Sequence, residues 1–379
     1  MIAIYIIIGF LVIRLGIVIF NVLGNLKLSS PVVRINSDFI SILIPVKDEE
    51  KNIIALLNSI KAQDYQNYEV IVLDDDSWDD TYNLVSHFSL SNPQFKIVRG
   101  EKLPAGWLGK NYACYQLSKL ASGDFFLFLD ADVLIKPKLL NKSLCRLKEG
   151  NLSLLSLFAE QKMKTLGEWL TVPLMNYFLL SFLPLSLVKK STEEKLAAAN
   201  GQFMLFPKDS YLENGWHREV RNKVAEDYEI CKKVKAKKLL VETLLGTGYL
   251  TCRMYEGLSE GINGFTKNTY SLFNYNFWGT LVFLSTISLG YVWVFYYGNY
   301  TLCLIVLGLV VGIRVLTSWL SKQNILINLV LHPFQICFMV WITSQSIYKN
   351  NLGKIVWKGR LLNPLIPKSA VFKNQALRS

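Results

Sequence analysis

Hydrophobic and polar residues follow two different patterns along this chain of 379 residues. Between about residues 37 and 267, short apolar runs alternate with stretches in which apolar residues recur at helical spacing. Short apolar runs bounded by polar residues predict buried strands. Long stretches without charge lie before and after this part, and they predict membrane segments.

Strands and helices alternate regularly in the first half of the middle part. We expect strands at residues 40–46, 69–73, 95–98 and 125–129, and helices at residues 49–63, 79–88 and 111–121. Such alternation favours a mostly parallel sheet with helices on both faces. The predicted fold class is therefore α/β.

The long apolar stretches suit a membrane protein. Residues 2–23 lack the small-residue cleavage site of a signal peptide and predict a retained anchor. No charged residue occurs at 268–313, which is long enough for two spans with a break near Gly298, and residues 325–347 suffice for one more. Buried core helices are the alternative, but they rarely run this far without charge.

These segments divide the chain into four parts. They are an anchor (1–24), a folded domain (37–267), a membrane region of two to three spans (268–347) and a basic tail (348–379). Three full spans after the domain would place the tail on the opposite side of the membrane. We favour a tail on the domain side, with the last segment re-entrant or interfacial and a possible break at His332-Pro333.

Composition and charge narrow the class further. Hydrophobic residues make up 51% of the chain, and the net charge is +12. Basic residues beside spans favour the cytoplasmic face and anionic headgroups, and no basic stripe is interleaved with stacking aromatics, so we expect no nucleic acid partner. The six cysteines have neither paired nor metal-ligand spacing, which is typical of a reducing compartment.

Two acidic motifs follow predicted strands. Asp74-Asp75 comes after residues 69–73, and Asp130-Ala131-Asp132 comes after residues 125–129. Two carboxylates at one strand end are stable together where a cation neutralises them, so the second motif predicts a hard divalent ion shared with a phosphate. The alternative is a solvated turn, because Asp is common where strands stop.

Lys110 is the candidate for contacting the phosphate. It begins a predicted helix, where backbone N–H groups and the helix dipole favour an anion. No Gly-rich phosphate loop occurs in the sequence, so a diphosphate would need the metal and a basic residue instead. An ordinary solvated lysine is the alternative.

Together these segments resemble the ordered motifs of family 2 glycosyltransferases with the GT-A fold. The matching segments are residues 41–50, Asp74-Asp75, Gly109-Lys110, Asp130-Ala131-Asp132 and Glu226-Asp227. The resemblance covers essentially the whole chain. It is nearest to membrane-anchored, non-processive members that act on lipids, such as carotenoid glucosyltransferases and hopanoid-pathway glycosyltransferases. Residues 106–116 and Trp357-Lys358-Gly359-Arg360 resemble signatures of that subgroup.

The resemblance implies that a nucleotide binds at the first acidic motif. Pro45, Glu49 and Asp75 would contact its base and ribose, and Asp74 would support the turn. The family usually has glycine where this chain has Asp76, which tolerates a left-handed conformation. No Gln-x-x-Arg-Trp motif of processive synthases follows, so we do not expect chain polymerisation.

The resemblance also implies roles in catalysis. Lys110 would face the diphosphate, Asp130 the ribose or metal, and Asp132 the Mg²⁺ or Mn²⁺ that bridges the phosphates. Asp227 would be the base that takes a proton from an acceptor hydroxyl while its oxygen attacks the anomeric carbon, which inverts that centre. Helix capping is the alternative for Asp227.

Weaker candidates and one ambiguous segment complete the prediction. The weaker candidates are Glu226, His217, Lys267 and Arg253, of which His217 is equally well explained as a packing residue. The apolar segment 166–188 fits a buried helix pair or helices in the membrane interface beside an apolar acceptor, and we favour the second.

The sequence therefore predicts a metal-dependent, inverting glycosyltransferase in the cell membrane, with its catalytic domain on the cytoplasmic face. It would move one hexose from a nucleoside diphosphate, with UDP-glucose as the first choice, to a polyisoprenoid or other lipid. The alternative acceptors are a diacylglycerol, a polyprenyl phosphate or a surface polysaccharide. An inactive nucleotide- or lipid-binding scaffold is the alternative of a different class.

Overall fold

The central sheet is mostly parallel, as predicted. The structure, a computed structural model, describes residues 2–29 and 38–362, and within them seven strands pair in the order β3-β2-β1-β4-β8-β6-β9. β8 alone runs antiparallel to its neighbours β4 and β6 in this sheet. The strands are β1 (Ile40–Val46), β2 (Tyr68–Asp74), β3 (Phe95–Arg99), β4 (Phe125–Leu129), β6 (Leu154–Phe158), β8 (Phe203–Pro207) and β9 (Val241–Leu245).

Helices cover both faces of the sheet because its strands are apolar on both sides. Along β1, Ile42 and Ile44 pack into one core and Leu43 into the other, as the twofold period of a strand requires. The first core includes side chains of α2 (Ile53–Lys61), α3 (Thr81–Leu90) and α5 (Leu139–Glu149). The second includes side chains of α4 (Gly109–Leu120), α9 (Lys208–Asn214), α10 (Trp216–Glu219) and α11 (Glu226–Ala236).

A smaller sheet of three strands begins directly after the Asp130-Ala131-Asp132 motif. It contains β5 (Val133–Ile135), β10 (Leu250–Cys252) and β7 (Glu160–Gln161). β10 pairs antiparallel with β5 and parallel with β7. This pairing fixes the backbone on the carboxyl side of the acidic motif.

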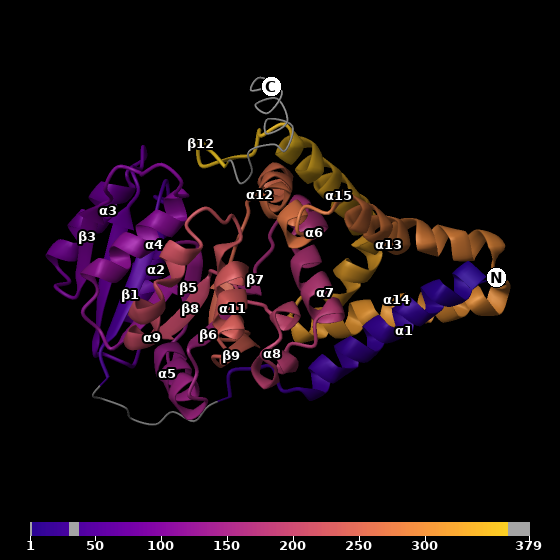
Figure 1. The fold of residues 1–379 in the computed structure, drawn as a ribbon, viewed down its shortest axis with the longest axis horizontal. Helices are drawn as coiled ribbons and strands as arrows, with labels where there is room; N and C mark the ends of the chain where they lie inside the picture. The colour runs from indigo at the N-terminus through magenta and orange to yellow at the C-terminus, as the bar shows by residue number, and fades with distance from the viewer. Residues whose placement is uncertain (1, 30–37, 363–379) are drawn as a thin grey trace, which may run out of the picture.

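Four of the described helices are long and apolar enough to cross a membrane. α1 (Ile2–Leu23), α13 (Phe277–Tyr297) and α14 (Tyr300–Leu320) extend from the domain as an arm, with the N-terminal end of α1 far from the sheet (Figure 1). The predicted break near Gly298 is present, and the Asn299 side chain caps α14 by accepting a hydrogen bond from Leu302 N at 3.0 Å.

The fourth long helix, α15 (Ile325–Asn351), packs along the domain, and Pro333 does not interrupt it. It contacts α6 (Leu166–Thr171) and α12 (Gly257–Leu272) as well as α14. The strands after it, β11 (Val356–Trp357) and β12 (Arg360–Leu361), form a hairpin against the domain (Figure 1).

The hairpin at the start of the tail therefore lies beside the domain. That the tail and the domain share one side of a membrane, and which face this is, stays a prediction, as do the predicted domain boundaries. Residues 363–379 of the tail, with Lys368, lie outside the described residues.

The apolar segment at residues 166–188 forms α6, α7 (Pro173–Phe182) and the start of α8 (Ser186–Lys190). α7 packs against α1, α14 and α15, so it is buried between the domain and the arm. Arg14 of α1 donates to Ser181 Oγ at 2.7 Å and stacks on Phe182, and Asn21 donates to the carbonyl oxygens of Leu180 and Leu183 at 2.8 Å. These contacts attach α1 to the domain.

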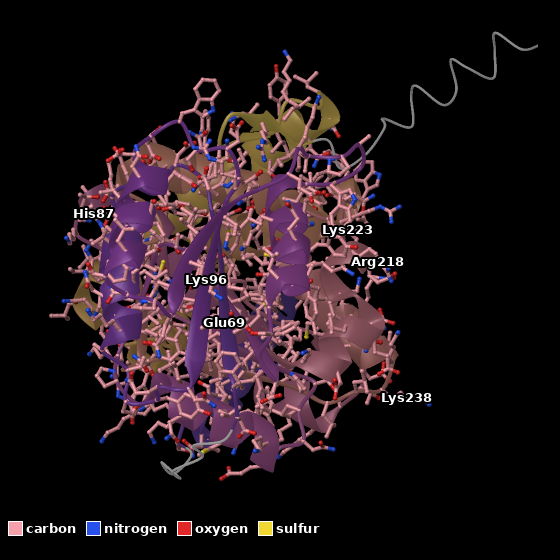
Figure 2. The ribbon with its side chains drawn as sticks, turned by 90° about the vertical axis from the view of Figure 1, so that its left-hand side faces the viewer. Glu69, His87, Lys96, Arg218, Lys223 and Lys238 are labelled. Atoms are coloured by element: carbon pink, nitrogen blue, oxygen red, sulfur yellow. The ribbon has the colours of Figure 1, made fainter. Side chains whose placement is uncertain are left out.

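The side of the domain that faces away from the arm is polar. Figure 2 shows Glu69 of β2, His87 of α3 and Lys96 of the edge strand β3 on this side. Glu69 pairs with Lys96 at 3.7 Å and accepts hydrogen bonds from the hydroxyl groups of Ser41 and Ser122. A surface of this kind suits contact with water, in contrast to the apolar arm.

Candidate active site

The carboxyl ends of β1, β2 and β4 meet at one edge of the sheet, because these strands are parallel and adjacent. A cavity of about 770 Å³ opens at this edge. It brings together most of the residues that the sequence singled out: Pro45, Glu49, Asp75, Lys110, Asp130, Asp132, Glu226, Asp227 and Lys267. The predicted site residues outside it are Asp74, His217 and Arg253.

Asp74 is the last residue of β2, does not line the cavity and holds the turn that follows the strand. Its side chain is 4% exposed and accepts a hydrogen bond from Ser77 N at 3.3 Å. Asp76 has a φ of 64°, the left-handed conformation expected where the family has glycine. The local turn therefore survives the substitution, and Asp75 is left facing the cavity.

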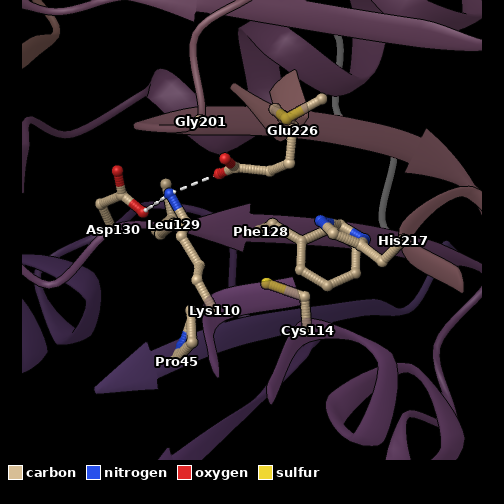
Figure 3. Close-up of a pocket in the computed structure, with 10 residues that line it drawn as sticks. Pro45, Lys110, Cys114, Phe128, Leu129, Asp130, Gly201, His217 and Glu226 are labelled. Carbon is tan, nitrogen blue, oxygen red and sulfur yellow. Dashed lines mark ion pairs between the residues drawn. The ribbon is translucent and has the colours of Figure 1, made fainter. Parts of the chain in front are cut away.

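Lys110 lies between two carboxylates at the centre of the site (Figure 3). Its Nζ is 2.7 Å from Asp130 Oδ1 and 2.9 Å from Glu226 Oε1. Burial disfavours the ammonium charge, but the negative charges of Asp130 and Glu226 outweigh it and raise the pKa of Lys110 well above its usual value. Lys110 is therefore a permanent cation at the start of α4, where an anion is favoured.

Asp227 occupies the second residue of α11 and faces the same cavity. Its carboxylate accepts hydrogen bonds from Gly201 N at 2.9 Å and from its neighbour Tyr228 N at 2.8 Å. Burial first, and then the charge of Glu226, raise the pKa of Asp227 to about 6. A carboxylate with such a pKa is well suited to accept a proton near neutral pH.

Asp130 and Asp132 fit a divalent cation. Burial and the charges of Asp130 and Glu49 raise the pKa of Asp132 to about 7, and its buried Oδ1 has no hydrogen-bond partner among the described residues. No group of three His, Cys, Asp or Glu side chains suited to a metal occurs in residues 2–29 and 38–362. Two carboxylates suffice for Mg²⁺ where phosphates supply further oxygens.

Two cations of the C-terminal hairpin form ion pairs with the carboxylates that were predicted to contact the nucleotide. Arg360 forms an ion pair with Asp75, and Lys358 forms one with Glu49. Lys358 and Arg360 were not among the predicted site residues, although residues 357–360 were marked as a subgroup signature and a tail on the domain side would place them beside the active site. Sequence alone gives no means to pair Asp75 with a residue 285 positions later.

The weaker candidates divide between the cavity and the rest of the fold. Lys267 enters the cavity with its Nζ 3.9 Å from the centre of the Trp357 ring, and burial lowers its pKa to about 8. His217 is buried against Phe128 and bonded to Tyr211 Oη at 2.7 Å, and burial lowers its pKa to about 3, so it is a neutral core residue. Arg253 instead pairs with Glu168 at 2.8 Å.

The other end of the cavity is apolar. It lies between α7, α12, the start of α13 and α15, which run toward the arm. The side chains that line it there are Leu174, Met175, Phe178, Leu179, Phe182, Leu183, Phe265, Leu272, Phe273, Phe283, Met339 and Ile342. A single cavity thus joins a charged region at the sheet edge with an apolar channel beside the long helices.

Part of the chain is similar in sequence to a known protein family. Residues 41–213 match the family described as Glycosyl transferase family 2. This part of the chain is therefore similar to family 2 glycosyltransferase domains, as the motifs predicted. The family match ends at residue 213, before Glu226 and Asp227. The roles of these two residues therefore rest on their position in the cavity.

Among the similar proteins is the 4,4'-diaponeurosporenoate glycosyltransferase of Staphylococcus haemolyticus, which is 28% identical over 60% of this chain and 60% of its own length. The enzyme of the same name from Staphylococcus aureus strain USA300 is 27% identical over 67% of this chain and 66% of its own. The matches thus span about 60–66% of these curated relatives.

Among solved structures, the mannosyltransferase PcManGT from Pyrobaculum calidifontis, in complex with GDP-Man and Mn²⁺, superposes with a TM-score of 0.49. It is 15% identical, and the superposition covers 99% of this chain and 91% of that chain.

Proposed function

We propose that this protein is a metal-dependent, inverting glycosyltransferase that moves one hexose from a nucleoside diphosphate sugar to a membrane lipid. Glucose from UDP-glucose is the first choice of donor, and a carotenoid or another polyisoprenoid is the first choice of acceptor. The names of the staphylococcal relatives support a carotenoid-type acceptor. The long apolar helices support a site at the membrane surface.

The shape of the cavity carries this proposal. Its charged region suits a sugar nucleotide, and its apolar channel suits a hydrocarbon chain, so the reacting groups of donor and acceptor would meet between them. Asp227 and Lys267 lie with the charged groups, and Phe178 and Met339 lie in the channel. A water-soluble acceptor would have no need for a lining of this kind.

In the proposed reaction, Asp227 takes the proton of an acceptor hydroxyl. The oxygen forms a bond to the anomeric carbon, the bond between that carbon and the diphosphate oxygen breaks, and the nucleoside diphosphate leaves with the electron pair. Lys110 and Lys267 would stabilise the negative charge of the leaving group. A divalent cation held by Asp130 and Asp132 would add positive charge there when bound.

An assay of the purified full-length protein tests this proposal. The protein in lipid nanodiscs is incubated with UDP-glucose or GDP-mannose, Mg²⁺ or Mn²⁺, and a carotenoid-containing lipid extract. We expect a lipid whose mass has increased by one hexose, detected by mass spectrometry. If no UDP- or GDP-sugar gives such a product with any lipid extract, the chain is better explained as a scaffold.

The transfer rate is expected to depend on pH with a maximum between about 6 and 8. Asp227 must be ionised to accept a proton, and its pKa is raised to about 6, so the rate should fall about tenfold per pH unit below that value. Lys267 loses its charge above its lowered pKa of about 8, which should reduce the rate at high pH. Initial rates from pH 5 to 9 measure both limbs, and a flat acid limb would contradict the role of Asp227.

A bulky residue in the channel should impair acceptor use alone. Met339 lines the channel from α15, and Met339→Trp should raise the KM for the lipid about tenfold or more, because overpacking costs about 1–3 kcal/mol. Val330→Trp, on the same helix but 71% exposed, is the matched control. Lipid titration measures KM, and UDP binding should be unchanged in both variants. An equal loss of UDP binding in Met339→Trp would argue against a separate acceptor channel.

A further inference from the structure

We propose that the C-terminal hairpin β11–β12 is part of the donor site and that Arg360 and Lys358 bind the diphosphate of the sugar nucleotide. This inference rests on the proposed function. In the structure, Arg360 forms an ion pair with Asp75 and Lys358 forms one with Glu49, and these are the carboxylates at which the base and ribose are expected. Binding of the donor would therefore displace them toward the phosphates that arrive with it.

Arg360 is held at the nucleotide end of the cavity by two contacts with one residue. Its Nη1 pairs with the Asp75 carboxylate, and its Nη2 donates to Asp75 O at 3.1 Å. A Cβ atom on Gly109 would lie 2.5 Å from Arg360 Nη1 and 2.7 Å from Asp75 Oδ2, so the guanidinium fits closely against the first residue of α4. Lys110 follows directly, and Arg360 is therefore next to the residue expected at the diphosphate.

Lys358 reaches the same region from the tip of the hairpin. Its Nζ donates to Lys47 O at 2.6 Å and pairs with the Glu49 carboxylate. Lys358 and Gly359 have φ values of 45° and 74°, as a tight two-residue turn between β11 and β12 requires. Because this turn is short, the two cations are presented together to the carboxylates of Glu49 and Asp75.

The hairpin is packed against α12 and is closed by a hydrogen bond at its base. Trp357 stacks on Lys267 of α12, Leu362 N donates to Ile355 O at 2.7 Å, and Ile355 is 3% exposed. The segment therefore has a defined position and is not a loosely attached tail. Removal of a charge from its tip should alter the donor site without unfolding the sheet.

The balance of charge gives the physical reason for the hairpin. Six carboxylates line the cavity, and they are matched by six cations, namely Lys47, Lys110, Lys223, Lys267, Lys358 and Arg360. Without the hairpin the carboxylates would outnumber the cations by six to four, and a diphosphate would enter a net negative site. Arginine also binds phosphate oxygens through two parallel N–H groups, which suits it to this position.

Binding of nucleotides with and without phosphates tests the inference. The dissociation constants of UDP and uridine are measured with Mg²⁺ by calorimetry for the full-length protein in nanodiscs, and GDP and guanosine are measured likewise. The comparison uses the base that the wild type binds, uracil or guanine. Arg360→Gln and Lys358→Gln should each raise the dissociation constant of the nucleoside diphosphate about tenfold or more. Uridine or guanosine should bind as before or more tightly, because Asp75 or Glu49 is then free.

Lys354→Gln is the matched control, since Lys354 is an exposed lysine of the same segment outside the cavity, and it should change neither constant. Arg360→Lys should restore part of the affinity for the diphosphate. The inference is overturned if Arg360→Gln leaves UDP and GDP binding within twofold of the wild type. It is also overturned if this substitution lowers the affinities for the nucleoside and for the nucleoside diphosphate equally. A wild type that binds neither diphosphate refutes the proposed function, and the inference with it.

Discussion

Asp227→Asn is expected to reduce the transfer rate by about 10²–10⁴-fold while the affinity for the nucleoside diphosphate stays unchanged. The amide has the shape of the carboxylate, and its one oxygen still accepts one of the two backbone hydrogen bonds, from Gly201 N or from Tyr228 N. It cannot take a proton from an acceptor hydroxyl, so the chemical step is lost. Single-turnover transfer to the lipid and calorimetric binding of UDP or GDP measure the two quantities separately.

Asp209→Asn provides the control for this variant, because Asp209 is exposed on α9 and does not line the cavity. Its transfer rate should equal that of the wild type. Helix capping, the alternative explanation of Asp227, predicts a different pattern: a lower melting temperature with nearly normal transfer. That pattern would remove Asp227 from the mechanism, and the raised pKa of this carboxyl would then be a mere result of its burial.

Asp132→Asn is expected to abolish the dependence of donor binding on divalent metal. Asp132 Oδ1 is buried without a partner among the described residues, and the nearest charges that raise its pKa belong to Asp130 and Glu49. Asparagine removes the negative charge that attracts the cation and leaves the volume unchanged. With Mn²⁺ present, the affinity of the variant for UDP should fall to the value that the wild type shows in EDTA.

The melting temperature of the Asp132→Asn variant without metal should be equal to or above that of the wild type, because a buried negative charge has been removed. Asp209→Asn again provides a matched control and should keep the full effect of Mn²⁺. If Mn²⁺ strengthened UDP binding equally in Asp132→Asn and the wild type, the cation would have to be held elsewhere.

Most of the sheet was predictable because its strands are short apolar runs with clear ends. The strands at residues 40–46 and 125–129 begin and end where the sequence predicted. The helix expected at residues 49–63 is shorter, and α2 starts at Ile53. Asp48 has a φ of 52°, and Glu49 N donates to Thr81 Oγ1 at 2.8 Å, so the backbone here forms a turn above the sheet edge.

The candidate site was predictable where residues follow a strand or begin a helix, and less so elsewhere. Asp75, Asp130 and Asp227 have such positions, and the structure brings all three to one cavity. His217 precedes the acidic pair in sequence, yet its ring packs into the core, since sequence proximity does not fix the direction of a side chain. Arg360 belongs to the site through the path of α15, which no local pattern reveals.

The polar contacts between α1 and α7 have a consequence for the order in which the protein is made. Arg14 and Asn21 leave the ribosome about 160 residues before their partners Ser181, Leu180 and Leu183. During that interval, the first helix would hold a charged group and an amide in the membrane without these partners. The newly made helix α1 should therefore depend strongly on the insertion machinery until α7 has been made and supplies these partners.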